Sequence, residues 1–177
     1  MSNVESQAEG GSPFWRFSLA FYRRPGIAET CLELQDGAGV DVNLLLFLLW
    51  RACARRALSG EAVRRLDETV GPWREAAVVP LRRLRRTLKG GVAPIEPGTA
   101  ELFRTRIKAM ELEAERLEQG TLYDLSRREA PGDEVASPAE AARISLASYE
   151  TLIGRRFPQA AVEKLLAALA EFETRET

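Results

Sequence analysis

The chain has 177 residues, a formal net charge of −1, and 45% hydrophobic against 29% charged residues, a composition that suits one globular domain. It contains no histidine and only two cysteines, Cys31 and Cys53. This excludes Ser-His-Asp and Cys-His catalysis, histidine-ligated zinc or haem, a four-cysteine zinc site and a CxxC redox centre. We therefore expect no cofactor, no metal and a non-enzymatic role, although carboxylates, arginine and tyrosine remain available for chemistry. Two buried, reduced thiols are typical of a cytoplasmic protein.

Residues 1–12 have neither the basic start nor the apolar segment of a secretory signal, and we expect them to form a disordered tail. The longest uncharged apolar stretch, Val42 to Trp50, is far shorter than the roughly 20 residues that span a bilayer. The sequence therefore predicts no membrane span.

The first three predicted helices follow clear start signals. A Ser-Pro pair begins a helix over residues 12–24, and a Pro-Gly pair separates it from a second helix that ends in the glycines of residues 36–39. Asp41 caps the third helix, which runs from Val42 to about Leu58 and is apolar on nearly every side as far as Trp50. Such a helix belongs at the centre of the fold.

From Ser59 to Leu88, apolar residues recur every three or four positions, which indicates helix. The pattern crosses Pro72 and Pro80. An interior proline removes a hydrogen bond and costs about 3 kcal/mol, so we expect a kink or break near Pro72 and consider a second one near Pro80. A loop follows over residues 90–98.

Thr99 is predicted to cap a long helix that reaches about residue 128. Its apolar residues repeat with 4-3-4-3 spacing over too few heptads for a free coiled coil, so we expect this stripe to pack on the preceding helix. The stripe consists of Phe103, Ile107, Met110, Ala114 and Leu117.

No strand pattern of any length is visible, so the sequence predicts an all-α fold: a compact bundle of about six to seven helices around the central apolar helix. We expect the disordered tail over residues 1–12, a helical core domain over 13–128 and a flexible linker over 129–138. A C-terminal helical hairpin over 139–177, which a capping box beginning at Ser137 introduces, is expected to pack on the core.

Basic residues concentrate in residues 51–90, which hold eleven basic side chains and four acidic ones. The densest part is one short helix, and it could bind the phosphates of RNA, DNA or another polyanion. It could equally be a solvated helix face, with inward leucines and outward arginines, partly neutralised by the acidic helix that follows. The sequence pI of about 5.8 and the lack of a nucleic-acid motif favour the second interpretation. The candidate polyanion-binding residues are Arg82, Arg83, Arg85, Arg86 and Lys89.

Four residues of the N-terminal region are candidates for a ligand site or for polar packing: Trp15, Gln35, Asn43 and Trp50. Asn43 lies at the start of an apolar helix, where an unpaired side chain costs roughly 1–3 kcal/mol. It could bond to Gln35 or to the aromatic helix and so fix helix packing. Alternatively, it could be part of a polar pocket lined by aromatic rings. The packing interpretation is favoured.

Three motifs together carry a family resemblance: W-x-F-S-L-x-x-Y from Trp15, C-L-x-L-Q-D from Cys31, and D-V-N-L-L-L-F-L-L-W from Asp41. Over residues 13–90 the chain resembles an uncharacterised proteobacterial family of short helical proteins, a domain of unknown function. The resemblance implies a bacterial cytoplasmic protein and brings no activity, cofactor or site residue.

The leading expectation is a non-enzymatic interaction or regulatory protein that binds another, unidentified protein through helical surfaces; a second copy of the chain is one candidate. Two alternatives stay open: polyanion binding through the helix of residues 81–89, and a small-molecule pocket near Trp15, Gln35 and Asn43.

Overall fold

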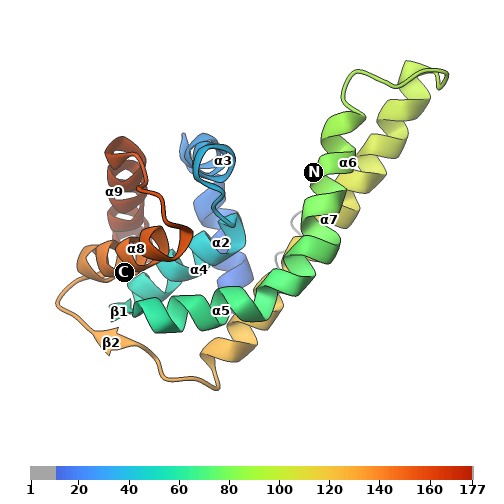
Figure 1. The fold of residues 1–177 in the computed structure, drawn as a ribbon. Helices are drawn as coiled ribbons and strands as arrows, with labels where there is room; N and C mark the ends of the chain where they lie inside the picture. Colours follow the sequence, from blue (N-terminus) through green and yellow to red (C-terminus); the bar gives the residue numbers. More distant parts are fainter. Residues whose placement is uncertain (1–10, 177) are drawn as a thin grey trace.

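The computed structural model describes residues 11–176 as helices joined by loops, with a single two-residue strand pair among them (Figure 1). The predicted all-α class is confirmed. The tail predicted over residues 1–12 lies outside the described residues except for residues 11 and 12. The chain begins with α2 (Pro13–Tyr22), α3 (Ile27–Ala38) and α4 (Val42–Cys53).

These three helices begin where the sequence predicts. The Ser12 hydroxyl accepts a hydrogen bond from the N–H of Trp15, and the Asp41 carboxylate accepts one from the N–H of Asn43. Gly39 ends α3 in the left-handed conformation, with φ of 75°. Every residue from Asn43 to Leu49 is buried, so α4 is the central helix of the fold.

The central helix ends at Cys53, and the prediction that it reaches Leu58 is wrong. Arg55 adopts a left-handed conformation with φ of 54°, which a helix cannot continue through. The chain then forms β1 (Arg56–Ala57), which pairs antiparallel with the distant β2 (Asp133–Glu134). Arginine, alanine and leucine are all good helix formers, so the local sequence gives no sign of this long-range pairing.

The two prolines after Ser59 change the helix without breaking it. The chain forms α5 (Gly60–Trp73), a π-helical turn η1 (Arg74–Val78) and then α6 (Val79–Thr87). Pro72 lies inside α5, and Pro80 lies in the first turn of α6. The wider π-helical turn lies between the prolines, and the chain bends there in Figure 1. The expected kink is thus displaced to η1.

The long helix α7 (Pro97–Ser126) starts two residues before Thr99, the residue that was predicted to cap it. Glu96 is its cap, because its carboxylate accepts hydrogen bonds from the N–H groups of Gly98 at 2.9 Å and Thr99 at 2.8 Å. A glutamate is an unusual cap, and the preceding prolines and glycines favoured a loop here, which explains the displaced start.

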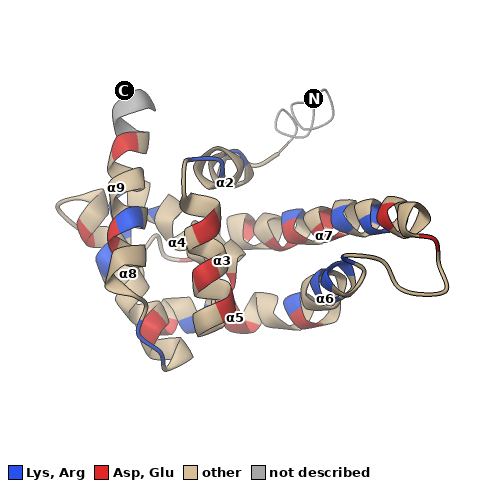
Figure 2. Ribbon diagram, turned by 90° about the horizontal axis from the view of Figure 1, so that it is seen from above, with Lys and Arg blue, Asp and Glu red and all other residues tan. Residues whose placement is uncertain are grey.

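One end of the molecule projects away from the rest. The N-terminal half of α7 runs antiparallel to α6, and together they form an arm, while the C-terminal half of α7 packs on α2, α4 and α5 (Figure 1; Figure 2). We call the projecting part, residues 74–117, the arm and the remainder the body. Helix α7 is therefore exposed in its N-terminal half, in the arm, and surrounded by other helices in its C-terminal half.

The body is completed by α8 (Pro138–Ile153) and α9 (Gln159–Glu176). Leu146 and Leu165 from these helices lie in the same buried cluster as the apolar residues of α4. The Phe172 ring contacts that of Phe17 in α2, with centroids 5.1 Å apart. Residues from both ends of the chain therefore share one core around α4.

Candidate functional site

The apolar stripe predicted for α7 is divided between two environments. Ile107 and Ala114 are buried as expected, but Phe103, Met110 and Leu117 are 50%, 57% and 46% exposed, so their predicted packing on the preceding helix is wrong. The inward positions are taken instead by two carboxyl residues, Glu111 and Glu118, together with the small and apolar residues between them. These carboxyl groups lie inside because partners on other helices meet them.

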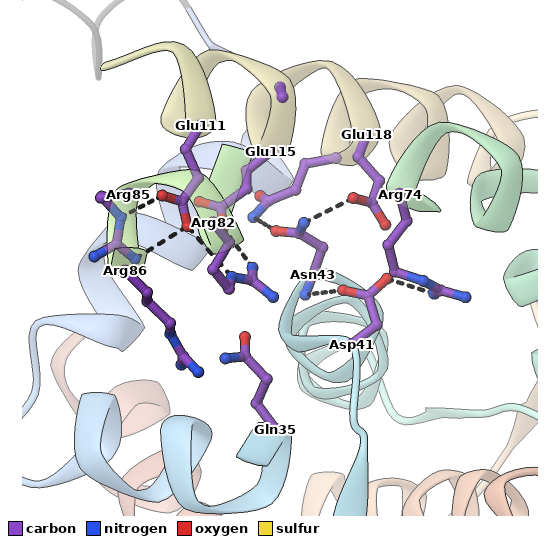
Figure 3. A network of polar contacts seen from close by, with 12 residues as sticks. Gln35, Asp41, Asn43, Arg74, Arg82, Arg85, Arg86, Glu111, Glu115 and Glu118 are labelled. Carbon is purple, nitrogen blue, oxygen red and sulfur yellow. Dashed lines mark hydrogen bonds and ion pairs between the residues drawn. The ribbon is translucent and has the colours of Figure 1, made fainter. Parts of the chain in front are cut away.

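Asn43 is buried at the centre of a hydrogen-bonded network that joins α4 to α7 (Figure 3). Its amide nitrogen donates to Oε2 of Glu118 at 3.0 Å, and its carbonyl oxygen accepts from Nε2 of Gln119 at 2.8 Å. Its backbone N–H donates to Oδ1 of Asp41 at 2.9 Å. The side chain is bonded at both ends, so the desolvation penalty of roughly 1–3 kcal/mol for an unpaired buried group is avoided.

Two carboxyl groups, those of Asp41 and Glu118, lie close together in this network. Arg74 donates to Oδ2 of Asp41 and to Oδ1 of Asp67, each at 2.8 Å. Its positive charge compensates the negative charges of these two aspartates. Burial, with a hydrogen bond to Asp41 and the charge of that residue, raises the pKa of Glu118 to about 10. The raised pKa favours the protonated form of Glu118, whose Oε1 has no hydrogen-bond partner among the described residues.

The network also reaches α8, because the backbone N–H of Asp41 donates to the hydroxyl of Tyr149 at 2.9 Å. A cavity of about 210 Å³ lies elsewhere, near Ser59 and Leu125, and an open groove lies on the outer side of α6; neither borders Asn43. The network fixes how α4, α7, α8 and the α5–η1 segment meet. It therefore favours the packing role of Asn43 over a role in a ligand pocket.

The other three polar or aromatic candidates are not brought into this network. Trp15 is buried in α2, and its indole N–H has no hydrogen-bond partner among the described residues. Gln35 is half-buried on α3, and among the residues that the structure describes its amide donates only to the neighbouring Asp36, at 3.4 Å. Trp50 packs between aromatic rings, 5.4 Å from Phe14 and 5.8 Å from Tyr123. The structure does not gather the four residues into one site.

Two of the five candidate cations, Arg82 and Arg85 on α6, hold the arm together. Arg82 donates to Glu111 at 3.3 Å and to Glu115 at 3.0 Å, and Arg85 also pairs with Glu111 (Figure 3). The hydrogen bond to Glu111 raises the pKa of Arg85, while burial raises that of Glu115. These guanidinium groups are partly buried and already bound to carboxylates of α7.

A third cation, Arg86, donates to the Asp36 carboxylate on α3 at 3.0 and 3.3 Å and so connects the arm to the body. Arg83 and Lys89 are exposed. The cluster that looks like an anion-binding patch in the sequence therefore has carboxylate partners for three of its five members.

The expected inward leucines and outward arginines of α6 are correct only in part. Leu81 and Leu88 are half-buried, whereas Leu84 is 40% exposed, and Arg82 and Arg85 turn toward α7. Ion pairs with α7 thus replace part of the apolar contact that the periodicity predicted.

The outer face of the arm carries a concentration of exposed apolar side chains, three of which the periodicity of the sequence assigned to packing. It comprises Leu102, Phe103, Met110 and Leu117 on α7. Trp73 extends it, because its indole N–H donates to the carbonyl of Ala114 at 2.9 Å while the ring is left 42% exposed. Large apolar residues at seven-residue spacing were the available signal. Glu111 and Glu118 repeat at the same spacing one residue further along, about 100° around the helix, and they were the sign that another face is buried.

Within residues 11–176 no group of three or more histidine, cysteine, aspartate or glutamate side chains is arranged to hold a metal ion. Over the same part of the chain, no helix has the length and apolar character that crossing a membrane requires.

Comparison with known proteins gives one match. Residues 13–122 fit the model of a family described as proteins of unknown function (DUF2390), which extends the resemblance seen over residues 13–90 through most of α7. No curated protein and no solved structure shows significant similarity. The matched segment covers α2 to α6 and most of α7, including Asn43 with its partners on α7 and the whole arm, and the chain belongs to the DUF2390 family.

Proposed function

We propose that this protein is a non-enzymatic interaction protein of the bacterial cytoplasm that binds another protein chain through the outer face of its arm. The observation that carries the proposal is the exposure of Leu102, Phe103, Met110 and Leu117 on a helix that projects from the body. Contiguous exposed apolar residues on an otherwise polar surface are typical of protein interaction sites.

The arm is held in place on its inner side, which suits a preformed binding surface. Arg82 and Arg85 join α6 to α7 through Glu111, and Arg86 joins α6 to α3. Binding through a preformed surface avoids much of the entropy cost of ordering it. The charged residues therefore serve the arm's own structure and leave its apolar side to a partner.

The two alternatives have less support from the geometry. A polyanion site needs uncompensated cations, but Arg82, Arg85 and Arg86 already have carboxylate partners. A ligand pocket at Asn43 needs free hydrogen-bonding groups, but its amide is bonded to Glu118 and Gln119. The cytoplasmic location is supported by the absence of a disulfide between the two cysteines and by the buried Cys31 thiol, whose pKa burial raises to about 12.

The test is affinity capture from the organism that encodes the protein, with nuclease treatment and a matched pair of variants. Met110→Glu places a charge on the arm, and Ile144→Glu places one at a similarly exposed position on α8. We expect a protein retained by the wild type and by Ile144→Glu to be lost with Met110→Glu. Retention by all three forms, or loss on nuclease treatment, would contradict the proposal.

A further inference from the structure

We propose that the occupant of the arm's outer face is a second copy of this chain, with the two α7 helices packed antiparallel about a two-fold axis near Met110. This inference rests on the proposed function, because it names the partner of the same face.

The spacing of the stripe is symmetric about its centre. Phe103 and Leu117 lie seven residues before and after Met110, all three exposed on one side of α7. In an antiparallel pair centred there, Phe103 lies opposite Leu117 of the second copy, and each Met110 meets its equivalent. A surface that meets itself across a two-fold axis must be self-complementary in this way.

The charges between these apolar residues select the same orientation. Arg106 and Glu113 continue the stripe with alternating spacings of three and four, and both are exposed. Arg106 has no ion pair among the described residues, while Glu113 pairs only within its own helix, with Arg116 at 2.6 Å. Antiparallel packing brings Arg106 opposite Glu113, whereas parallel packing would place Arg106 against Arg106 and Glu113 against Glu113.

The exposed area is sufficient for a specific dimer. At about 200 Å² for a fully exposed large side chain, Leu102, Phe103, Met110 and Leu117 leave roughly 400 Å² of apolar surface on each copy. Two copies contribute roughly 800 Å² of apolar surface, and the flanking Arg106 and Glu113 side chains add to it, which brings the pair toward the lower end of the sizes of specific interfaces. We expect a dimer in reversible equilibrium with its monomer rather than an obligate one.

Sedimentation of the purified full-length protein across the micromolar range tests the inference. We expect wild type and Ile144→Glu to shift from monomer to dimer with rising concentration and Met110→Glu to stay monomeric with an unchanged helical circular-dichroism spectrum. A wild type that is monomeric throughout, or a dimer that Met110→Glu leaves intact, would overturn it. If the wild type is monomeric but still captures another protein in a way that Met110→Glu abolishes, the identification of the partner as a second copy is wrong and the proposed function stands. If the monomeric wild type captures no protein, the proposed function fails as well.

Charge reversal tests the orientation. At low salt, Arg106→Glu and Glu113→Arg should each weaken dimerisation by about tenfold or more, because each creates two like-charge contacts across the axis. The double variant exchanges the charges and should restore dimerisation to near the wild-type level. A double variant as weak as the single ones contradicts the antiparallel arrangement.

Discussion

The body and the arm place their charged and apolar residues in opposite ways. In the body, α4 is surrounded by apolar side chains, and its own Asn43 is enclosed and bonded to Glu118 of α7. In the arm, Arg82 and Arg85 of α6 turn inward to carboxylates of α7 (Figure 3), while Phe103 and Met110 are exposed. Helix α7 therefore uses one face, with Glu111 and Glu118, for polar contacts within the chain. An adjacent apolar face, with Phe103 and Met110, is left exposed in the monomer.

The largest expected contrast lies between matched leucines of the two regions. Leu48→Ala, in the fully buried part of α4, should lower the free energy of unfolding by about 2–5 kcal/mol through lost burial and a residual cavity. Leu102→Ala, on the exposed face of the arm, should change it by less than about 0.5 kcal/mol. Urea unfolding at a concentration where the chain is monomeric measures both, and comparable losses would contradict the division into body and arm.

A second contrast separates an enclosed ion pair from an exposed one. Arg74→Met leaves the buried Asp41 carboxylate without its cation and should cost about 3 kcal/mol of unfolding free energy. Arg65→Met removes an exposed pair with Glu61 and should cost less than about 1 kcal/mol. The same urea measurement applies, and equal effects would show that the Asp41 network is not enclosed.

The third prediction concerns pH. Because the folded-state pKa of Glu118 is raised, the native chain holds a proton there that the unfolded chain releases above its usual pKa of 4.5, so this group lowers stability as pH rises toward about 10. Glu118→Gln mimics the protonated form and removes that dependence. Its stability relative to wild type should increase by roughly 2–3 kcal/mol between about pH 6 and about pH 8, because each pH unit is worth about 1.4 kcal/mol for one proton. A difference independent of pH would show that Glu118 is ionised.

The smallest effect is expected where the arm meets α3. The hydrogen bond from Arg86 lowers the pKa of Asp36, and both side chains are largely exposed. Arg86→Ala should return the pKa of Asp36 toward its usual value, as an NMR titration of the carboxyl group would show, while the melting temperature stays nearly unchanged. An unchanged pKa of Asp36 would show that the pair is not formed in solution.

Local signals in the sequence predicted the body better than the arm. Ser12 and Asp41 identify helix starts correctly, because a cap is a contact between near neighbours in the chain. The end of α4 was misplaced, since it depends on pairing between Arg56 and the distant Glu134.

The site was harder to predict because hydrophobic periodicity counts only apolar residues. It identified Asn43 as a buried polar side chain that needs hydrogen-bond partners. It could not show that these partners are Glu118 and Gln119, which lie some 75 residues later in the chain. It also assigned Met110 to the interior, because nothing local shows that Glu111 is buried by arginines of another helix.

The claim that the arm meets a second copy antiparallel is tested most directly by distances between spin labels in the dimer. Labels are placed singly at the exposed Ala109 and Thr99, in a background in which Cys53 is replaced by Ser. With a helical rise of about 1.5 Å per residue, pairing about Met110 predicts a short distance between labels at position 109 and one of at least about 33 Å between labels at position 99. A short distance at both positions would indicate parallel helices, and no dipolar coupling at position 109 would show that this face is not where two copies meet.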